Sequence, residues 1–154
     1  MRSSTRPYAP PRKLERALAR VLDFWNGLKR REAKIPFWDD VKLSALEELA
    51  ATLTMIDVSP KPARFRFAAG VVGEEIKRRY GGDLVDMFLD DIEIRYPFQF
   101  LISQCSATLE SGTPTYYRHS EARDARLQQA FSRLLLPLWG DGRIGMLLGA
   151  FAWQ

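Results

Sequence analysis

The sequence predicts an α+β domain: a five-stranded antiparallel sheet with short helices and one longer helix on one face, preceded by an N-terminal helix. Three observations lead to this prediction. A length of 154 residues with 46% hydrophobic residues is typical of one domain with a substantial core. Period-two alternation, which is typical of strands, occurs in two groups along the chain. Helical signals occur between these two groups and also near the N-terminus. We expect a disordered tail over residues 1–11, a basic amphipathic helix over 12–34 and a globular domain over 35–154.

The N-terminal segment divides into the tail and the helix. Residues 1–11 hold three prolines and show no periodicity, which predicts a disordered or extended tail. In the helix, apolar residues recur at steps of four and three along one face; they are Leu14, Leu18, Val21, Trp25 and Leu28. Two heptads are too few for a self-sufficient coiled coil, so this stripe packs either on the chain's own sheet or on the same helix of a second subunit. We predict a parallel homodimer through the stripe.

Turn signals and alternation predict the elements of the globular domain. Phe65 and Phe67 alternate with Arg64 and Arg66, which indicates a half-buried strand, and the proline-rich turn before it indicates a hairpin. The expected strands are residues 51–58, 64–69, 115–120, 127–139 and 143–153. The expected helices between the second and third strands are residues 74–80, 84–89 and 95–110.

Composition excludes several classes of protein. The longest apolar runs are far shorter than the roughly 20 residues that cross a bilayer. No apolar stretch follows the first arginines, which argues against a secretory signal peptide. The single cysteine, Cys105, leaves no intramolecular disulfide and no thiolate zinc site. We therefore expect a cytoplasmic protein without a membrane span.

Charge is spread unevenly along the chain. Residues 1–34 hold ten Lys/Arg against three Asp/Glu, whereas the remaining residues hold 13 against 16. A basic arm on a slightly acidic body is typical of proteins that bind nucleic acid, an anionic surface or an acidic partner, but more often it is only a solvated flank. Nucleic-acid or anionic-surface binding by this arm is the alternative function.

Several short motifs carry a resemblance to a known family. They are Phe24-Trp25, Pro36, Phe65-Arg66-Phe67 with Gly70 and Gly73, Tyr80-Gly81 with Asp83-Leu84, Gly112-Thr113-Pro114, Leu136-Pro137-Leu138 with Asp141-Gly142, and Leu148-Gly149. With the order of strands and helices, they resemble the PAS domain, closest to a bacterial family of small, mostly single-domain PAS proteins. The resemblance implies a sensory domain over residues 35–154 that binds a small molecule or a protein, is often dimeric and has no conserved chemistry.

The residues that would hold a cofactor do not fit one. Cys105 lies on the apolar face of a helix and outside any flavin-type motif, so we expect a buried structural thiol. His119, the only histidine, lies between Arg118 and Ser120 on a partly exposed strand and is expected to be a surface residue, not a haem ligand. We predict no metal and no cofactor, and leave open an unknown small-molecule ligand.

Catalytic residues are also not apparent. One histidine, one cysteine and no nucleophile elbow exclude the familiar triads and dyads. The pairs Asp39-Asp40 and Asp90-Asp91 are interpreted as solvated or capping residues. Asp57 and Glu121 are the only acid or base candidates on expected strands or beside them. We expect a protein that is not an enzyme.

A ligand pocket is the remaining hypothesis for the globular domain. Large apolar side chains are expected on the concave face, with Tyr116 and Arg118 as polar groups. The candidate pocket residues are Phe67, Met87, Phe88, Phe98, Ile102, Tyr116, Arg118, Leu136 and Met146. The competing interpretation is that these side chains simply fill the core.

The function predicted from these observations is a signalling adaptor. It would bind a small molecule or a partner protein and transmit its state through dimerisation or through contact with a separate signalling protein. No fused output domain is expected.

Overall fold

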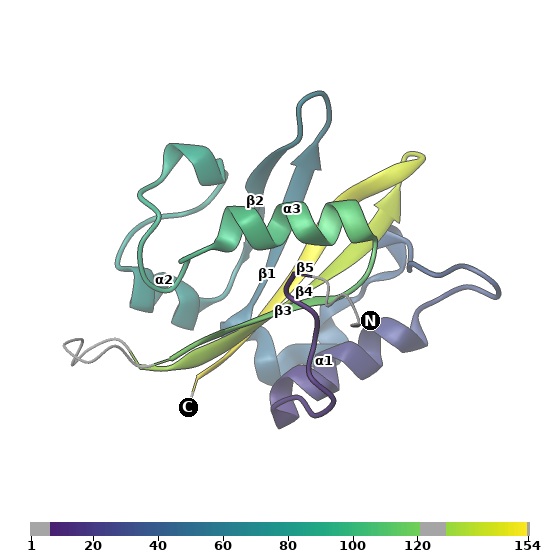
Figure 1. Cartoon of the computed structure of the whole chain (residues 1–154), viewed down its shortest axis with the longest axis horizontal. Helices are drawn as coiled ribbons and strands as arrows, with labels where there is room; N and C mark the ends of the chain where they lie inside the picture. The colour runs from purple at the N-terminus through teal and green to yellow at the C-terminus, as the bar shows by residue number, and fades with distance from the viewer. Residues whose placement is uncertain (1–6, 121–128, 154) are drawn as a thin grey trace, which may run out of the picture.

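The computed structural model describes residues 7–120 and 129–153, and it confirms the α+β class with an open antiparallel sheet (Figure 1). The order across the sheet is β2-β1-β5-β4-β3, and every neighbouring pair is antiparallel. The strands are β1 (Leu53–Ser59), β2 (Arg64–Val72), β3 (Thr115–His119), β4 (Phe131–Gly140) and β5 (Arg143–Trp153). The first and last strands in the chain, β1 and β5, therefore pair at the centre.

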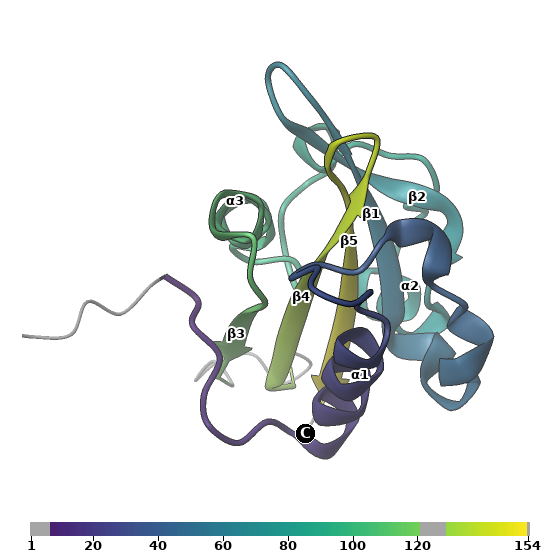
Figure 2. The ribbon, with the colours of Figure 1, turned by 90° about the vertical axis from the view of Figure 1, so that its right-hand side faces the viewer.

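Helices cover both faces of this sheet. Between β2 and β3 the chain forms α2 (Glu74–Tyr80), η3 (Leu89–Asp91) and α3 (Leu101–Ser111). Before β1 it forms α1 (Arg16–Gly27), η1 (Trp38–Asp40) and η2 (Leu43–Thr52). Figure 2 shows α3 and α1 on opposite sides of the strands. Throughout the described residues, no helix has the length and apolar character needed to cross a membrane.

Two apolar clusters result from this layering. On the face covered by α2 and α3, which we call the helical face, Phe67 of β2 and Phe151 of β5 pack in one cluster with Phe98. The opposite face, which we call the α1 face, packs Leu18, Trp25 and other side chains on Leu134, Leu136 and Leu148. Because both faces are covered, residues 131–138 of β4 are all buried, and the strand is an almost continuous apolar run without polar alternation.

Two expected helices begin or end elsewhere. The N-terminal helix ends at Gly27 and not near Lys34, because the residues after the glycine form turns. The long helix begins at Leu101 and not at Arg95, since the residue before Pro97 is biased against helical backbone and Phe100 has a φ of 61°. The prediction of a short helix over 84–89 is wrong, because this region has only a 3₁₀ turn at Leu89–Asp91.

The tail is also more ordered than expected over its described part, residues 7–11. The backbone N–H of Tyr116 in β3 donates to the carbonyl of Tyr8 at 2.7 Å. The Tyr8 hydroxyl donates to Ser103 Oγ in α3 at 2.8 Å, and its ring meets that of Tyr117 edge-on. Tyr8 therefore covers part of the outer edge of β3, while residues 1–6 lie outside the described residues.

Glu75 gives this fold a measurable acid sensitivity. It binds Arg78 and Arg79 within α2, and these hydrogen bonds lower the pKa of Glu75 to about 2 from 4.5. A carboxylate with a lowered pKa stabilises the fold above pH 4.5 and loses that contribution as the pH falls to 2. We expect Glu75→Gln to remove about 1 kcal/mol at neutral pH, a value reduced by solvent screening, and much less at pH 2.

Urea unfolding at several pH values measures this difference. The control is Glu74→Gln, because Glu74 is the next residue and its side chain is 85% exposed. A Glu75→Gln effect that stays constant from pH 7 to pH 2 would contradict the assignment.

Candidate functional site: a buried arginine and a basic surface trough

Arg133 is the most unusual side chain of the helical face. It projects from β4, is 0% exposed, and lies over the ring of Tyr117 at 4.8 Å. Its Nε donates to Gln104 Oε1 at 2.7 Å, and its Nη atoms donate to the carbonyls of Pro97 and Gln99 at 3.0 and 2.8 Å. Burial lowers the pKa of Arg133 to about 10, so the group is still charged at neutral pH. Within the described residues no carboxylate pairs with it.

Gln104 connects this arginine to a buried polar network. The amide nitrogen of Gln104, in α3, donates to Thr115 Oγ1 at 3.1 Å and to the Arg133 carbonyl at 3.3 Å. The hydroxyls of Thr108 and Thr115 are 2.6 Å apart, and Thr108 donates to the Gln104 carbonyl. The network joins α3 to β3 and β4, which fixes the helix on the sheet.

Two polar atoms beside this cluster have no hydrogen-bond partner among the described residues: Gln99 Oε1 and His119 Nε2. His119 stacks on Phe131 with ring centroids 5.1 Å apart, and its Nδ1 lies 3.2 Å from the Tyr117 hydroxyl. Burial, together with the charge of Arg133, lowers the pKa of His119. His119 is thus a half-buried neutral imidazole, more enclosed than the surface residue that the sequence predicted.

Cys105 is buried next to this network, as expected. Burial raises the pKa of its thiol to about 12, although the charge of Arg133 acts in the opposite direction. A thiol with this pKa is protonated at neutral pH and is a poor nucleophile. The surroundings of Cys105 therefore favour a packing role.

The α1 face carries a different cluster around Glu15, the residue before α1. Its carboxylate accepts hydrogen bonds from Ser132, from Tyr116 at 2.9 Å and from Arg118 at 3.4 Å. Burial alone would raise the pKa of Glu15, but the hydrogen bonds from Ser132, from the backbone and from Tyr116, together with the charge of Arg118, outweigh it and lower the pKa. Ser132 and Arg133 are neighbours in β4 whose side chains point to opposite faces, so this cluster lies directly behind the arginine site.

The apolar stripe of the N-terminal helix is not available for the predicted dimer. Leu18, Val21 and Trp25 are 0%, 1% and 2% exposed and pack on the chain's own sheet. The Trp25 indole N–H donates to the Pro137 carbonyl at 2.8 Å. Leu14 and Leu28 are only partly buried at the two ends of the stripe. The sequence allowed the stripe to pack either on the chain's own sheet or on the same helix of a second subunit, and in the structure it packs on the sheet.

The candidate pocket residues do not converge on one cavity, which corrects the pocket prediction. Phe67, Phe98 and Ile102 belong to the helical face. Tyr116, Leu136 and Met146 pack on the α1 face, since strand residues of opposite parity point to opposite sides. The other three lie at the surface or partly so: Met87 is 38% exposed, Phe88 is stacked under Arg64, and Arg118 pairs with Glu15.

The aspartates considered as acids or bases are held in ion pairs. Asp57 accepts from Arg66 at 2.8 Å, Asp90 pairs with Arg64, and Asp40 pairs with Arg30. Glu121 lies outside the described residues. Among the described residues, no group of three or more His, Cys, Asp or Glu side chains is placed to hold a metal ion.

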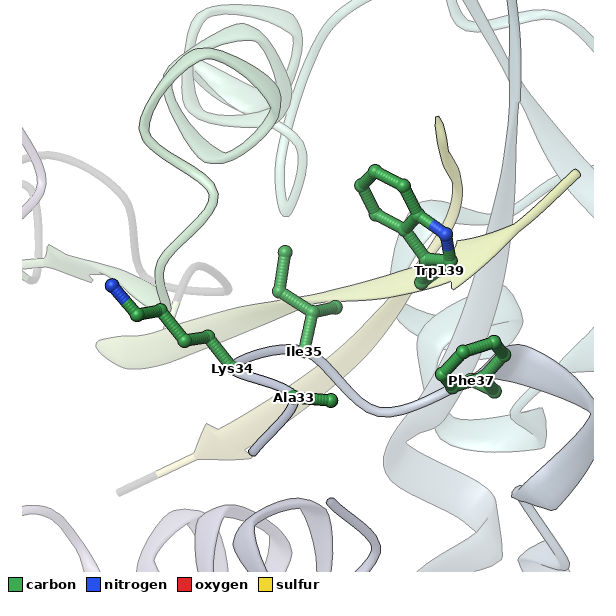
Figure 3. A pocket seen from close by; sticks show the side chains of 5 residues that line it. All are labelled: Ala33, Lys34, Ile35, Phe37 and Trp139. Atoms are coloured by element: carbon green, nitrogen blue, oxygen red, sulfur yellow. The ribbon is translucent and has the colours of Figure 1, made fainter. Parts of the chain in front are cut away.

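Three surface hollows near the C-terminal end of α3 share lining residues with one another. The first, about 680 Å³, lies between the end of α1 and the turn after α3 and is lined by Trp25, Lys29, Lys34 and Ile35. The second, about 260 Å³, shares Lys34 and Ile35 and reaches Trp139 of β4 (Figure 3).

The third hollow, about 440 Å³, shares Trp139 and continues past Leu109 and Ile144 to Lys61 and Arg143. We call the three together the basic trough. Its cations are Lys29, Lys34, Lys61 and Arg143, and no carboxylate is among its lining residues.

Neither Arg133 nor the trough was predicted from the sequence. A signal for Arg133 was present: it is the only cation in the apolar run from Phe131 to Trp139, at the parity of Phe131 and Leu135. The sequence contains no comparable signal for the trough, because its lysines come from segments that only the fold brings together.

Comparisons with known proteins add no assignment: no protein-family model, curated protein or solved structure matches this chain.

Proposed function

We propose that the chain is a PAS-like adaptor module, not an enzyme, that acts by binding a partner protein. The observation that carries this proposal is the sheet order β2-β1-β5-β4-β3 with all helices between β2 and β3 on one face. This order, with an N-terminal helix on the opposite face, is the arrangement that a PAS domain would have. It supports the resemblance independently of the short sequence motifs.

The packing of the interior favours a protein partner over a large cofactor. The helical face is filled by aromatic rings and by Arg133, and the hollows described above open at the surface instead. An adaptor of this kind would pass its state to a separate signalling protein through surface contacts. Cytoplasmic location is part of the same proposal.

Cross-linking in the source cells tests this function. A tagged chain, treated with a lysine-reactive cross-linker, is expected to recover the same protein partner in repeated experiments, and a tagged unrelated domain is not. The proposal fails if no partner recurs while a bound small molecule is released each time the protein is denatured.

A second candidate function, sensing of a small anion, is favoured by one specific observation. Arg133 is a buried charge with no carboxylate partner in the described part of the chain, and His119 Nε2 is an unpaired polar atom beside it. If the Tyr117 hydroxyl donates to His119 Nδ1, then Nε2 carries the proton and is a second donor for an anion. Native mass spectrometry of the freshly purified protein is expected to show an acidic adduct that Arg133→Lys weakens. An adduct unaffected by this variant would exclude the site.

A further inference from the structure

The basic trough has the properties of a docking groove for a chain-like ligand. We propose that it binds a short segment of a separate partner protein in which acidic residues flank apolar ones. This names the partner surface of the proposed adaptor and therefore rests on that function. Three neighbouring hollows that share lining residues, of about 680, 260 and 440 Å³, suit an extended segment better than one compact molecule.

The floor of the trough is apolar and fixed. Ile35 lies at its centre, and Figure 3 shows it beside Trp139. The Trp139 backbone N–H donates to the Pro36 carbonyl at 2.8 Å, which ties this loop to β4. A Cβ built on Gly112 would lie 3.7 Å from Ile35 and 3.9 Å from Ile144, so the turn after α3 closes over both side chains. Burial of apolar partner side chains on this floor would supply most of the affinity.

The charges around this floor are all of one sign. Among the described residues, no ion pair holds Lys29, Lys34 or Lys61, whereas the neighbouring Arg30 is bound by Asp40. Glu32 is near Lys34 in the chain, but it is not among the lining residues of any of the three hollows. Acidic side chains on a partner would therefore meet unneutralised ammonium groups, which favours the acidic partner and disfavours a basic one.

Nucleic acid fits the trough less well, because two of its three lining aromatic side chains, Trp25 and Phe37, do not present free faces. Trp25 is 2% exposed and lies under the Lys29 ammonium at 4.5 Å. The ring of Phe37 is covered by Arg30 at 4.2 Å. Stacking of bases on aromatic rings, the usual means of holding a single strand, would need these faces open.

Fluorescence anisotropy with defined peptides tests the docking site. The probe is a labelled ten-residue peptide of alternating Asp and Leu; peptides of alternating Lys and Leu and of alternating Asp and Ser test charge and apolar contact separately. We expect the Asp-Leu peptide to bind at least about tenfold more tightly than either of the others. Its binding is expected to weaken, but not vanish, as salt is raised, since only the exposed charges are screened.

Matched charge reversals locate the site. Lys29→Glu and Lys34→Glu are each expected to raise the Kd of the Asp-Leu peptide by about tenfold. Lys13→Glu makes the same charge change at an exposed position outside the trough and is expected to leave the Kd unchanged. Equal effects of all three variants would overturn the proposal, because they would show only the net charge of the chain.

Three further outcomes would also overturn the docking site. A labelled ten-nucleotide thymidine oligomer that binds more tightly than the peptide and competes with it would indicate nucleic acid. Self-association in light scattering that Lys34→Glu abolishes would indicate a second copy of the chain. If cross-linking recovers a partner whose cross-links lie outside the trough, the adaptor function stands and only the docking site fails.

Discussion

Gly73→Ala is expected to destabilise the protein by about 3 kcal/mol, the upper part of the range for overpacked sites. Gly73 is the residue before α2, and its N–H donates to the Leu53 carbonyl at 2.8 Å. A Cβ at this position would lie 2.2 Å from the Ala51 carbonyl oxygen and 2.7 Å from that of Ala50. Both atoms are backbone of η2, which is followed directly by β1 and cannot yield as a flexible side chain would.

The same substitution elsewhere in the chain supplies the control. Gly27, the last residue of α1, has no atom within 4 Å of an added Cβ and does not require a positive φ. Gly27→Ala is therefore expected to stabilise the protein by about 0.5 kcal/mol, because alanine has the higher helix propensity and restricts the unfolded chain. Urea denaturation of both variants measures the two effects. Similar free energies of unfolding for the two variants would contradict the contact at Gly73.

The sheet was largely predictable, since its signals are local. Alternation placed Phe65 and Phe67 inward, and they are 5% and 0% exposed. The turn at Gly140-Asp141-Gly142 joins the last two strands, and Asp141 and Gly142 have the positive φ angles that such a tight turn needs. The helix over Glu74–Tyr80 ends at Gly81, whose φ of 80° is the left-handed conformation of a C-cap glycine.

Contacts between distant segments were not predictable in the same way. A heptad stripe has the same pattern whether it meets a second helix or a sheet, so the stripe of α1 did not reveal its partner. Proline and small residues predicted a tail, but Tyr8 is held by Tyr116 and Ser103, more than 90 residues away in the chain. The pocket prediction failed for a related reason: residues of β3, β4 and β5 were combined without regard to which face each one occupies.

The second large effect is expected at Arg133, where Arg133→Ala should cost about 3–5 kcal/mol, the range for removing a large buried side chain and leaving buried acceptors without a donor. The variant would leave three acceptors of the helical face without their donor: Gln104 Oε1 and the carbonyls of Pro97 and Gln99. It would also leave a space next to Tyr117 and Phe151, because the guanidinium packs against these rings. The free energy of unfolding of a domain of this size is only about 5–15 kcal/mol, so we expect the Arg133→Ala variant to be partly unfolded at 37 °C.

Arg64→Ala is the control, and the contrast between the two arginines is the test. Arg64 makes more ion pairs than Arg133, with contacts to Asp90 at 2.9 Å and to Asp91 at 3.5 Å, but its side chain is 40% exposed. Exposed pairs contribute up to about 1 kcal/mol, so Arg64→Ala is expected to lose no more than that. Arg133→Lys keeps the charge and folds more readily, yet it should recover only part of the loss, because an ammonium group cannot reach three acceptors in the guanidinium geometry. A larger loss of stability for Arg64→Ala than for Arg133→Ala in urea denaturation would contradict this prediction. It would mean that ion pairs, and not burial, determine the stability of this face. The buried network around Gln104 would then not be what holds α3 on the sheet.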